Sequence, residues 1–585
     1  MTMLTEQLIG WVWVWPMVLA ALIGWPQLRP FAMLSLVLAV LPGWVLWGSA
    51  WGIADLDVDP IHQAWSFWLL GSQWRLDTLS HSWLGLTLMV WTLAALHSFV
   101  MVSANKTRYA LFFLLSLSGS LMWVLAADAV SFYLGFSLMS LSAWGLVIHE
   151  GTGKALRAGR WYLVLAIIGE LILFVGVVAR AAETGTTLLS DWQTLASSDW
   201  ILVCLWLGLA IKVGVPLLHV WLPLAHPAAP VPASAVLSGV MIKAGVIGWW
   251  LLFPSEAMAQ SAWPEFMLWL GVVTMFYGAV FGLMQDDPKT LLAYSSISQM
   301  GWLIWGLGWV WQIESPEIGM LWLSAFALHH GLVKGGLFLS VGWIKQPSVM
   351  ASPWLRTLTW VGVVILALVL SGLPLTSGDW VKTALKAEAE NIGATVPSSL
   401  LWLGGLATAL LMVRFVKILR NLSDQKLTQT ANPVLTKKVI GVWFSWVSLV
   451  VLVLVWPWWQ ANHWITANVW QGSVHGLWPI AIAIILIQIW HWLRWPELTT
   501  PPGDVLVWYQ WLGGNAQSGF KRLSRKWQAN KRLAVRRWRH WQPRHLLKND
   551  WRIRYEAIFS DWQVIIGSLM LLIVLIGLSV MERSI

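Results

Sequence analysis

The stretch IKVGVPLLHVWLPLAHPAAPVPASAVLSGVMIKAGVIGWW, residues 211–250, is the most informative part of this sequence. It is mostly apolar and long enough for membrane helices, yet it contains Lys212, Lys243 and five prolines. A lysine at the centre of a membrane helix costs about 2.5–3.5 kcal/mol on insertion scales. Non-helical backbone persists at membrane depth only where protein buries it or water surrounds it. The stretch therefore predicts a proline-broken region that lines an ion path.

The composition of the whole chain is that of a polytopic membrane protein. Of its 585 residues, 58% are hydrophobic and only 11% are charged, whereas soluble domains carry about 25% charged residues. The single cysteine, Cys204, excludes an internal disulfide and a cysteine-ligated iron–sulfur cluster. The histidines show no metal-ligand spacing, so we expect neither a metal nor another cofactor.

Hydropathy predicts about sixteen membrane spans of near 20 residues each. Their expected starts are Leu8, Phe31, Trp83, Thr107, Ala129, Trp161, Trp200, Pro232, Pro264, Thr290, Ile318, Arg356, Pro397, Lys438, Leu477 and Asp561. We interpret the first run as a retained span, because no cleavage site of the signal-peptide type follows it.

The charges of the loops predict the orientation of these spans. Basic loops, such as those at Arg157 and Lys437, alternate with loops that carry acids, such as Asp57 and Glu183. The positive-inside rule then places the basic loops in the cytoplasm and both termini outside, in the inner membrane of a bacterium. The same rule accounts for the net charge of +10, so we do not expect nucleic-acid binding.

Two similar broken spans indicate internal symmetry. The segment SGLPLTSGDWVKTALK, residues 371–386, again combines a proline with lysines, as the stretch around Lys212 does. Paired broken helices in the two halves of a chain are typical of inverted-repeat transporters. The sequence therefore predicts an all-α protein of six parts: N-terminal helices 1–106, a first repeat 107–255, a second repeat 264–420, further helices 438–494, a basic amphipathic surface helix 495–560 and a terminal membrane helix 561–585.

The surface helix has two interpretations that the residues leave open. Its Lys and Arg recur with Trp and Leu at helical intervals, as in FKRLSRKWQANKRLAVRRWRHW, residues 520–541. Such a helix lies on the cytoplasmic face, either bound to anionic lipid or running along the surface to neighbouring subunits.

Ionisable residues inside the apolar spans are the candidate site. We predict a proton relay that comprises Glu170, Lys212, Lys243, His330, Lys334 and Lys382, with Ser137, His219, His329 and Asp379 as accessory positions. Burial lowers the pKa of a lysine by up to about 3–5 units and a neighbouring carboxylate raises it again, so such groups can pass protons. Structural alternatives remain for several of them: Glu170 could pair with Arg157 or Arg160, the histidines could be packing residues, and the lysines could snorkel.

Several motifs resemble those of a known family. The run HVWLPLAHPAAPVPASAVLSGVMIKAG, residues 219–245, is similar to the signature of the antiporter-like subunits of respiratory complex I, Mrp-type cation/proton antiporters and membrane-bound hydrogenases. LLAYSSISQMG, HHGLVKGGLFLSVG and LSGLPLTSGDWVK resemble further family segments in the same order. The ending, with its surface helix and last span, resembles the distal complex I subunit that carries a lateral helix.

The resemblance implies two inverted five-helix repeats and a central polar axis for protons. By motif, Lys212 matches the lysine of the first broken helix and Lys243 the connecting lysine. His330 and Lys334 match the central relay, and Lys382 matches the outer lysine.

One departure from the family pattern concerns the carboxylate partner of the first lysine. The family has a glutamate in the fifth span, where this chain has Ser137 in FYLGFSLMSLSAW. We expect Glu170 of the next span to replace it. Asp379 beside Lys382 is a second unusual partner.

The leading hypothesis is a proton-conducting subunit of a larger membrane complex, which translocates ions rather than catalysing redox chemistry. Three alternatives stay open at this point: a Na⁺/H⁺ exchange subunit of the Mrp type, the ion-conducting subunit of an inorganic-carbon (CO₂/bicarbonate) accumulating complex with a zinc-bearing partner, and a non-conducting scaffold.

Overall fold

The computed structural model describes residues 2–50, 60–66, 68, 71–391, 398–427, 435–464, 477–493 and 499–506. Most of the predicted surface helix 495–560 and all of the predicted terminal helix 561–585 lie outside these residues. The described residues of 1–63 and 73–504 belong to one compact unit, and the description that follows concerns that unit.

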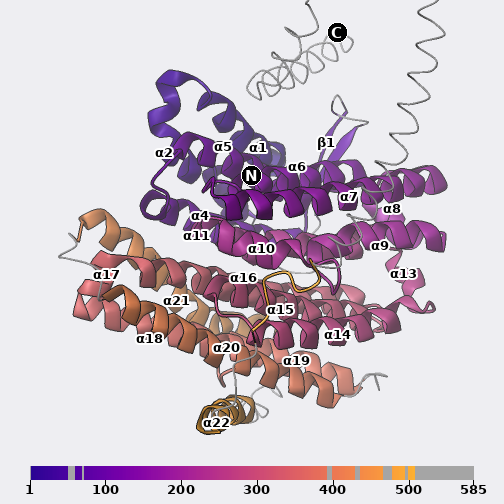
Figure 1. Cartoon of the computed structure of the whole chain (residues 1–585). Helices are drawn as coiled ribbons and strands as arrows, with labels where there is room; N and C mark the ends of the chain where they lie inside the picture. The colour runs from indigo at the N-terminus through magenta and orange to yellow at the C-terminus, as the bar shows by residue number, and fades with distance from the viewer. Residues whose placement is uncertain are drawn as a thin grey trace, which may run out of the picture. The chain divides into compact units, whose positions relative to one another are not determined.

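The N-terminal part consists of helices and one short two-stranded sheet (Figure 1). Its elements are α1 (Thr2–Leu22), η1 (Pro26–Phe31), α2 (Ala32–Leu38), α3 (Leu41–Ser49), β1 (Ile61–Trp65), β2 (Ser72–Leu76) and α4 (Thr78–Met101). Asp77 starts α4 with a capping box: its carboxylate accepts from the Ser80 amide at 2.7 Å, and the Ser80 hydroxyl accepts from the Asp77 amide at 2.8 Å. The pair satisfies amide groups that have no partner inside the helix.

The next elements, from residue 106 to 252, include the first interrupted helices. They are α5 (Lys106–Leu125), α6 (Ala129–Val147), α7 (Gly153–Thr184), α8 (Leu189–Thr194), α9 (Asp199–Val213), α10 (Trp221–Ala228), α11 (Val231–Gly239), η3 (Met241–Lys243) and α12 (Ala244–Leu252). The prolines between α9 and α11 explain the short pieces, because proline removes a helical hydrogen bond and clashes with the preceding turn.

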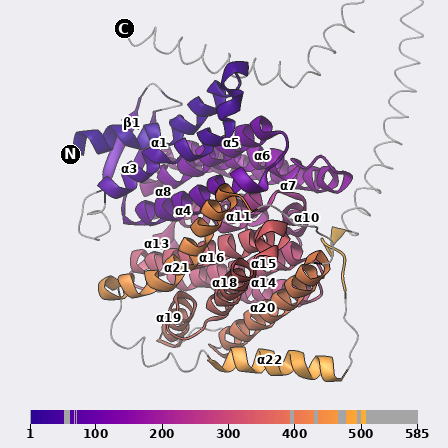
Figure 2. The same cartoon turned by 90° about the vertical axis from the view of Figure 1, so that its left-hand side faces the viewer.

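The C-terminal half continues from residue 255. Its elements are α13 (Ser255–Met258), α14 (Trp263–Leu283), α15 (Pro288–Val310), α16 (Pro316–Lys345), α17 (Pro347–Ala351), α18 (Pro353–Ser371), α19 (Ser377–Asn391), α20 (Ser398–Leu427), α21 (Lys437–Trp464) and α22 (Leu477–Trp492). Asp287 caps α15 by accepting from the Thr290 amide at 2.9 Å. Figure 2 shows α22 running beside α20, against which it packs.

Glycines let two helix pairs approach closely. A Cβ at Gly119 of α5 would lie 2.6 Å from the carbonyl oxygen of Gly135 in α6. A Cβ at Gly271 of α14 would lie 2.7 Å from the carbonyl oxygen of Gly301 in α15. Small residues at such crossings allow backbone-to-backbone packing, which is how membrane helices associate without a hydrophobic driving force.

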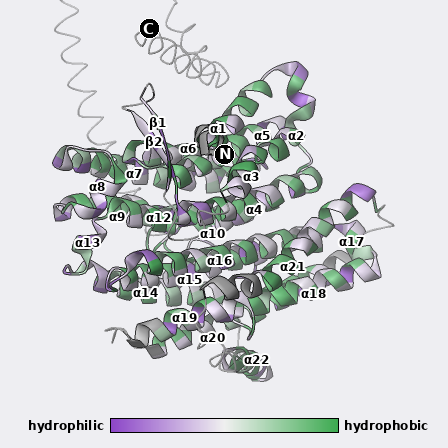
Figure 3. Cartoon of the chain, turned by 180° about the vertical axis from the view of Figure 1, so that it is seen from behind, coloured by the Kyte–Doolittle hydropathy of each residue, from purple (hydrophilic) through white to green (hydrophobic). Residues whose placement is uncertain are grey.

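Ten helices among the described residues are long and apolar enough to cross a membrane, and α1 and α22 contain shorter apolar helices. Helices α15 and α16 are long as well, but they carry more polar residues. Every residue of α15 is buried, and α16 lies between α4 and α11 on one side and α18 and α21 on the other (Figures 1 and 3). Because protein rather than lipid surrounds them, these two helices tolerate polar side chains that a lipid-exposed helix would not.

Candidate functional site

The first helix break places Lys212 at the end of α9. Helix α9 stops at Val213, and Gly214 follows in the left-handed conformation with φ of 80°. The Trp221 indole at the start of α10 donates to the carbonyl of Ile211 at 2.7 Å, across the break. This contact fixes the two helical pieces to each other and satisfies one of the carbonyl groups that the end of α9 leaves unpaired.

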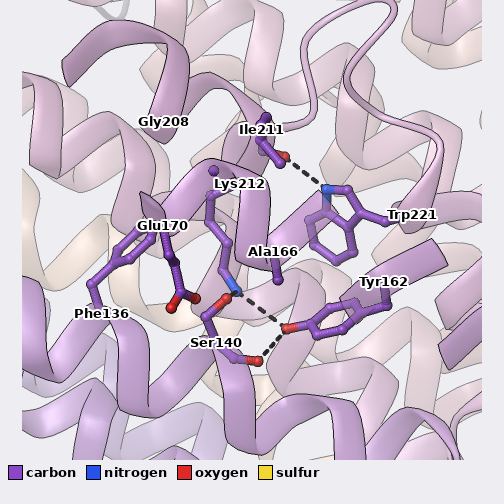
Figure 4. Close-up of a pocket in the computed structure, with 10 residues that line it drawn as sticks. Phe136, Ser140, Tyr162, Ala166, Glu170, Gly208, Ile211, Lys212 and Trp221 are labelled. Carbon is purple, nitrogen blue, oxygen red and sulfur yellow. Dashed lines mark hydrogen bonds between the residues drawn. The ribbon is translucent and has the colours of Figure 1, made fainter. Parts of the chain in front are cut away.

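The ammonium group of Lys212 lies in a buried polar site between α6, α7 and α9 (Figure 4). It donates to the Ser140 hydroxyl at 3.2 Å and to the Tyr162 hydroxyl at 3.4 Å, and Tyr162 in turn donates to the Ser140 carbonyl at 2.7 Å. The Trp221 ring lies 5.6 Å from the same ammonium group. The site therefore offers hydroxyl groups and aromatic faces to a buried cation.

Glu170 of α7 belongs to this site. Its side chain is buried and lines the same small cavity as Lys212 (Figure 4). Lys212 is also the charged group that acts electrostatically on the Glu170 carboxylate. No direct ion pair joins the two in the described structure. Ser137 and Ser140 of α6 face the carboxylate. Arg157 and Arg160 are exposed, so they are not the partners of this buried group.

Close packing of α7 on α9 brings Glu170 to Lys212. A Cβ at Gly208 would lie 2.8 Å from the carbonyl oxygen of Gly169, so neither position has room for a larger side chain without a shift. Gly169 directly precedes Glu170, and Gly208 lies one helical turn before Lys212. The two glycines thus set how near the carboxylate comes to the lysine.

A second group of predicted residues lies between α11 and α16. Lys243 donates to the carbonyls of Ser238 and Gly239 at 3.1 and 2.6 Å. Lys334 of α16 donates to the carbonyl of Leu292 at 3.0 Å. The Ser238 and Ser296 hydroxyls lie 2.7 Å apart, and Ser296 also donates to the Leu292 carbonyl at 2.9 Å. Each lysine is thus bound to backbone carbonyls, and the pair of hydroxyls links Ser238 to the Leu292 carbonyl that Lys334 binds.

His330 precedes Lys334 by one turn of α16. It is fully buried, and both ring nitrogens lack a hydrogen-bond partner within the described part of the chain. The charged groups that act on it are Lys243, Lys334 and Lys382, together with the neighbouring His329. The structure therefore gathers His330 and three predicted lysines into one electrostatically connected group.

The second break places Lys382 beside α16. Helix α18 ends at Ser371, and Gly372 follows with φ of 93°. Helix α19 starts at Ser377, whose hydroxyl lies 2.8 Å from Nδ1 of His329. Lys382 donates to the carbonyl of Leu370 at 2.6 Å. Asp379 accepts from the Thr383 hydroxyl at 3.2 Å and makes no ion pair with Lys382 among the described contacts.

Sequence reasoning did not find some members of the site. Tyr162 was missed, although its spacing to Ala166 and Glu170 puts all three on one face of α7, where they line the cavity. His219 was named only as an accessory position. The structure places it in the first break, with Nε2 2.9 Å from Oδ1 of Asp504. The described residues contain no cluster of three His, Cys, Asp or Glu that could hold a metal ion.

The comparisons with known proteins agree with the motifs. Residues 126–401 match the family model for the transmembrane domain of NADH:quinone oxidoreductases and Mrp antiporters. The chain is 31% identical over 289 residues to hydrogenase-4 component B of Escherichia coli, a match that covers 46% of this chain and 42% of that protein. It is 29% identical to NADH-ubiquinone oxidoreductase chain 4 of Metridium senile, over 42% of this chain and 52% of that one. The chain thus spans about half the length of these relatives.

Solved structures show the same fold. A chain of the Mrp complex from Dietzia sp. superimposes with a TM-score of 0.66 at 18% identity, over 82% of this chain and 99% of that chain. A chain of the membrane-bound sulfane sulfur reductase, an archaeal respiratory complex, gives a TM-score of 0.64 at 21% identity, over 83% and 99%. These two structures show the fold alone, whereas the family match shows that residues 126–401 carry the transmembrane domain of the antiporter-like family of NADH:quinone oxidoreductases and Mrp antiporters.

Proposed function

We propose that the chain conducts protons as the antiporter-like subunit of a larger membrane complex. The observation that supports this most strongly is the placement of chargeable side chains at both helix breaks and at buried positions of α16 between them. In this proposal the two broken helices belong to two inverted repeats, and each repeat contributes half of the route.

Glu170 and Lys212 form the first half of the proposed path. A carboxylate near a buried ammonium group favours the charged lysine, and moving the negative charge away favours release of its proton. Because the two groups share a cavity without a direct ion pair, a small displacement of either changes their interaction. In this role Glu170 replaces the glutamate that the family has at the position of Ser137.

The group around His330 forms the continuation of the proposed proton path. Lys243, Lys334 and Lys382 act on one imidazole, with no carboxylate among the groups that act on it. Like charges this close cannot all be present at once, so protons would leave and bind in a coupled manner. Buried polar groups are normally paired with protein or water, and the two unpaired nitrogens of His330 are therefore suited to contact internal water.

The same observation favours H⁺ over Na⁺. A hard cation such as Na⁺ requires several oxygen ligands, as Mg²⁺ and Ca²⁺ do. Lysine and histidine side chains repel it and offer no oxygen. A path through the group around His330 is therefore suited to protons, which these side chains can bind covalently.

The deciding experiment measures proton uptake by vesicles that contain the chain in its native complex, with an imposed membrane potential and a pH-sensitive dye. We expect Lys212→Ala to reduce uptake at least tenfold without loss of assembly, because the ammonium group is replaced by a methyl group that binds no proton. Lys106→Ala, which removes an exposed lysine at the start of α5, is the matched control and should retain wild-type uptake.

Two results would contradict the proposal. Wild-type proton uptake in Lys212→Ala would favour the alternative in which the chain is a non-conducting scaffold. Uptake that requires sodium, tested by replacing it with choline, would favour the Na⁺/H⁺ exchanger instead.

A further inference from the structure

The segment after α22 reaches back to the first helix break. Thr500 and Asp504 lie in a turn of sequence TPPGD, and this yellow segment runs beside α10 and α15 in Figure 1. The Thr500 amide donates to the carbonyl of Met284 at 3.2 Å, and its hydroxyl accepts from the side-chain amide of Gln285 at 3.0 Å. Gly503 turns the chain with φ of 74°, and a Cβ there would already touch Val220 at 3.4 Å.

Asp504 receives three side-chain hydrogen bonds at this place. Its Oδ1 accepts from Nε2 of His219 at 2.9 Å and from the Tyr294 hydroxyl at 2.8 Å, and its Oδ2 accepts from the Tyr277 hydroxyl. The Asp504 side chain is only 7% exposed and that of His219 is 0% exposed. An ionised carboxylate only accepts hydrogen bonds, so each of the three partners must donate.

This requirement fixes the tautomer of His219. If Nε2 donates to Asp504, the neutral ring carries its proton on Nε2 and leaves a free electron pair on Nδ1. Nδ1 is buried and has no hydrogen-bond partner in the part of the chain that the structure describes. The rings of Tyr277 and Tyr294 pack against the imidazole, at 5.0 and 5.8 Å between centroids, and hold its plane.

His219 lies in the break between α9, which contains Lys212, and α10. A Cβ at Gly214, two residues after Lys212, would lie 3.7 Å from the Cβ of His219. A ring fixed here can bind a proton on Nδ1 and become an imidazolium that the Asp504 carboxylate stabilises. A hydronium ion or a protonated side chain on the path breaks its bond to hydrogen as the Nδ1–H bond forms, and release transfers the proton from Nδ1 to the next acceptor, while the Nε2–H hydrogen bond to Asp504 stays unchanged.

We propose that Asp504 is a positioning residue for His219: it holds the imidazole with its proton on Nε2, so that Nδ1 is the nitrogen that takes up and releases protons at the first break. The inference rests on the proposed proton conduction and adds to it a carboxylate from the segment that follows α22. Asp504 does not itself carry the proton.

The test uses the vesicle assay for the full chain in its complex. We expect Asp504→Asn to lower proton uptake about tenfold or more, since an amide group can donate to Nε2 and so reverse the tautomer. His219→Gln should lower uptake by a similar factor. Thr500→Val is the matched control, because it removes a hydrogen bond of the same segment without touching His219, and it should keep wild-type uptake.

The double variant separates positioning from a merely structural role. If Asp504 acts through His219, Asp504→Asn in the His219→Gln background causes no further loss. Losses that multiply, or wild-type uptake in Asp504→Asn, overturn the inference. If the Asp504→Asn protein does not accumulate in the membrane, the test rests on His219→Gln. Wild-type proton uptake in His219→Gln then overturns the inference.

The Lys212→Ala variant distinguishes a failure of this inference from a failure of the proposed function. Loss of uptake in Lys212→Ala with wild-type uptake in Asp504→Asn rejects only the role of Asp504. Wild-type uptake in Lys212→Ala rejects proton conduction along the proposed path, and the role of Asp504 with it.

Discussion

Gly214 and Gly372 occupy equivalent positions in the two helix breaks, with φ of 80° and 93°. Three residues after each glycine a leucine also has positive φ: 72° at Leu217 and 65° at Leu375. The local sequences are Gly-Val-Pro-Leu and Gly-Leu-Pro-Leu. A left-handed conformation costs a non-glycine residue about 1–2 kcal/mol, so the fold maintains the same unfavourable backbone at both breaks.

The first prediction concerns these glycines. Gly214→Ala and Gly372→Ala should each lower the free energy of unfolding by about 1–2 kcal/mol, because the left-handed backbone conformation is less favourable for alanine than for glycine. Thermal unfolding of the purified protein in detergent measures the effect. Gly441→Ala in α21 is the control: a Cβ there meets no atom within 4 Å, and alanine in a helix interior stabilises by roughly 0.5–1 kcal/mol. The same sign of effect at all three positions would contradict the argument.

The second prediction tests whether Glu170 replaces the missing family carboxylate. Glu170→Gln keeps the side-chain volume but removes the charge beside Lys212, so proton uptake should fall about tenfold or more, since one pKa unit of lost interaction is worth about 1.4 kcal/mol. Ser137 faces the same carboxylate from α6. Ser137→Glu in the Glu170→Gln background should therefore restore part of the uptake.

The control for this pair is Ser137→Glu alone. It places two carboxylates in one small buried cavity, where like charges disfavour each other, and should reduce uptake rather than raise it. Wild-type uptake in Glu170→Gln would show that Lys212 needs no carboxylate from α7.

The positions of the helix breaks and of the buried lysines were predictable from sequence, because proline and charge are conspicuous in apolar spans. The absence of a carboxylate at Ser137 led us to expect Glu170 near Lys212, and both residues line one cavity. That Glu170 is the partner of Lys212 stays a prediction. These are local signals, in which one residue type conflicts with its surroundings. Lys243, Lys334 and Lys382 are the lysines that act electrostatically on His330 in the structure, and their role as a relay stays a prediction.

The remaining members of the site depend on contacts that spacing does not reveal. Asp504 lies 285 residues from His219 in sequence, and nothing in the TPPGD turn indicates which helix it contacts. Likewise, hydropathy alone does not show whether α16 faces lipid or protein. Its burial between other helices is a property of packing, and only that packing explains why its histidines and lysine are tolerated.

The third prediction separates the stability of Lys334 from its role in transport. A buried cation is costly, so Lys334→Met, which keeps similar volume, should leave thermal stability unchanged or raise it by about 1 kcal/mol or more. Proton uptake should nevertheless fall at least tenfold, because methionine binds no proton. Lys345→Met removes an exposed lysine from the last turn of the same helix and should affect neither quantity. A Lys334→Met variant that unfolds readily would instead mark the lysine as structural.

The last prediction follows from the charge of Asp504, which lies outside the membrane-spanning helices. Burial alone would raise the pKa of Asp504, but hydrogen bonds from His219, Tyr277 and Tyr294 outweigh it, and the pKa lies below its ordinary value of 3.8. A carboxyl group whose pKa is lower in the folded protein contributes stability above its unfolded pKa and loses it as the pH falls through the folded value. The thermal midpoint of the wild type should therefore exceed that of Asp504→Asn at about pH 5, and the difference should shrink as the pH falls below about pH 4. Thr500→Val carries no titrating change, so its difference from the wild type should not vary with pH. A difference between wild type and Asp504→Asn that widens as the pH falls below about pH 4 would mean that Asp504 is protonated in the folded protein. A protonated carboxyl group could not impose the tautomer of His219.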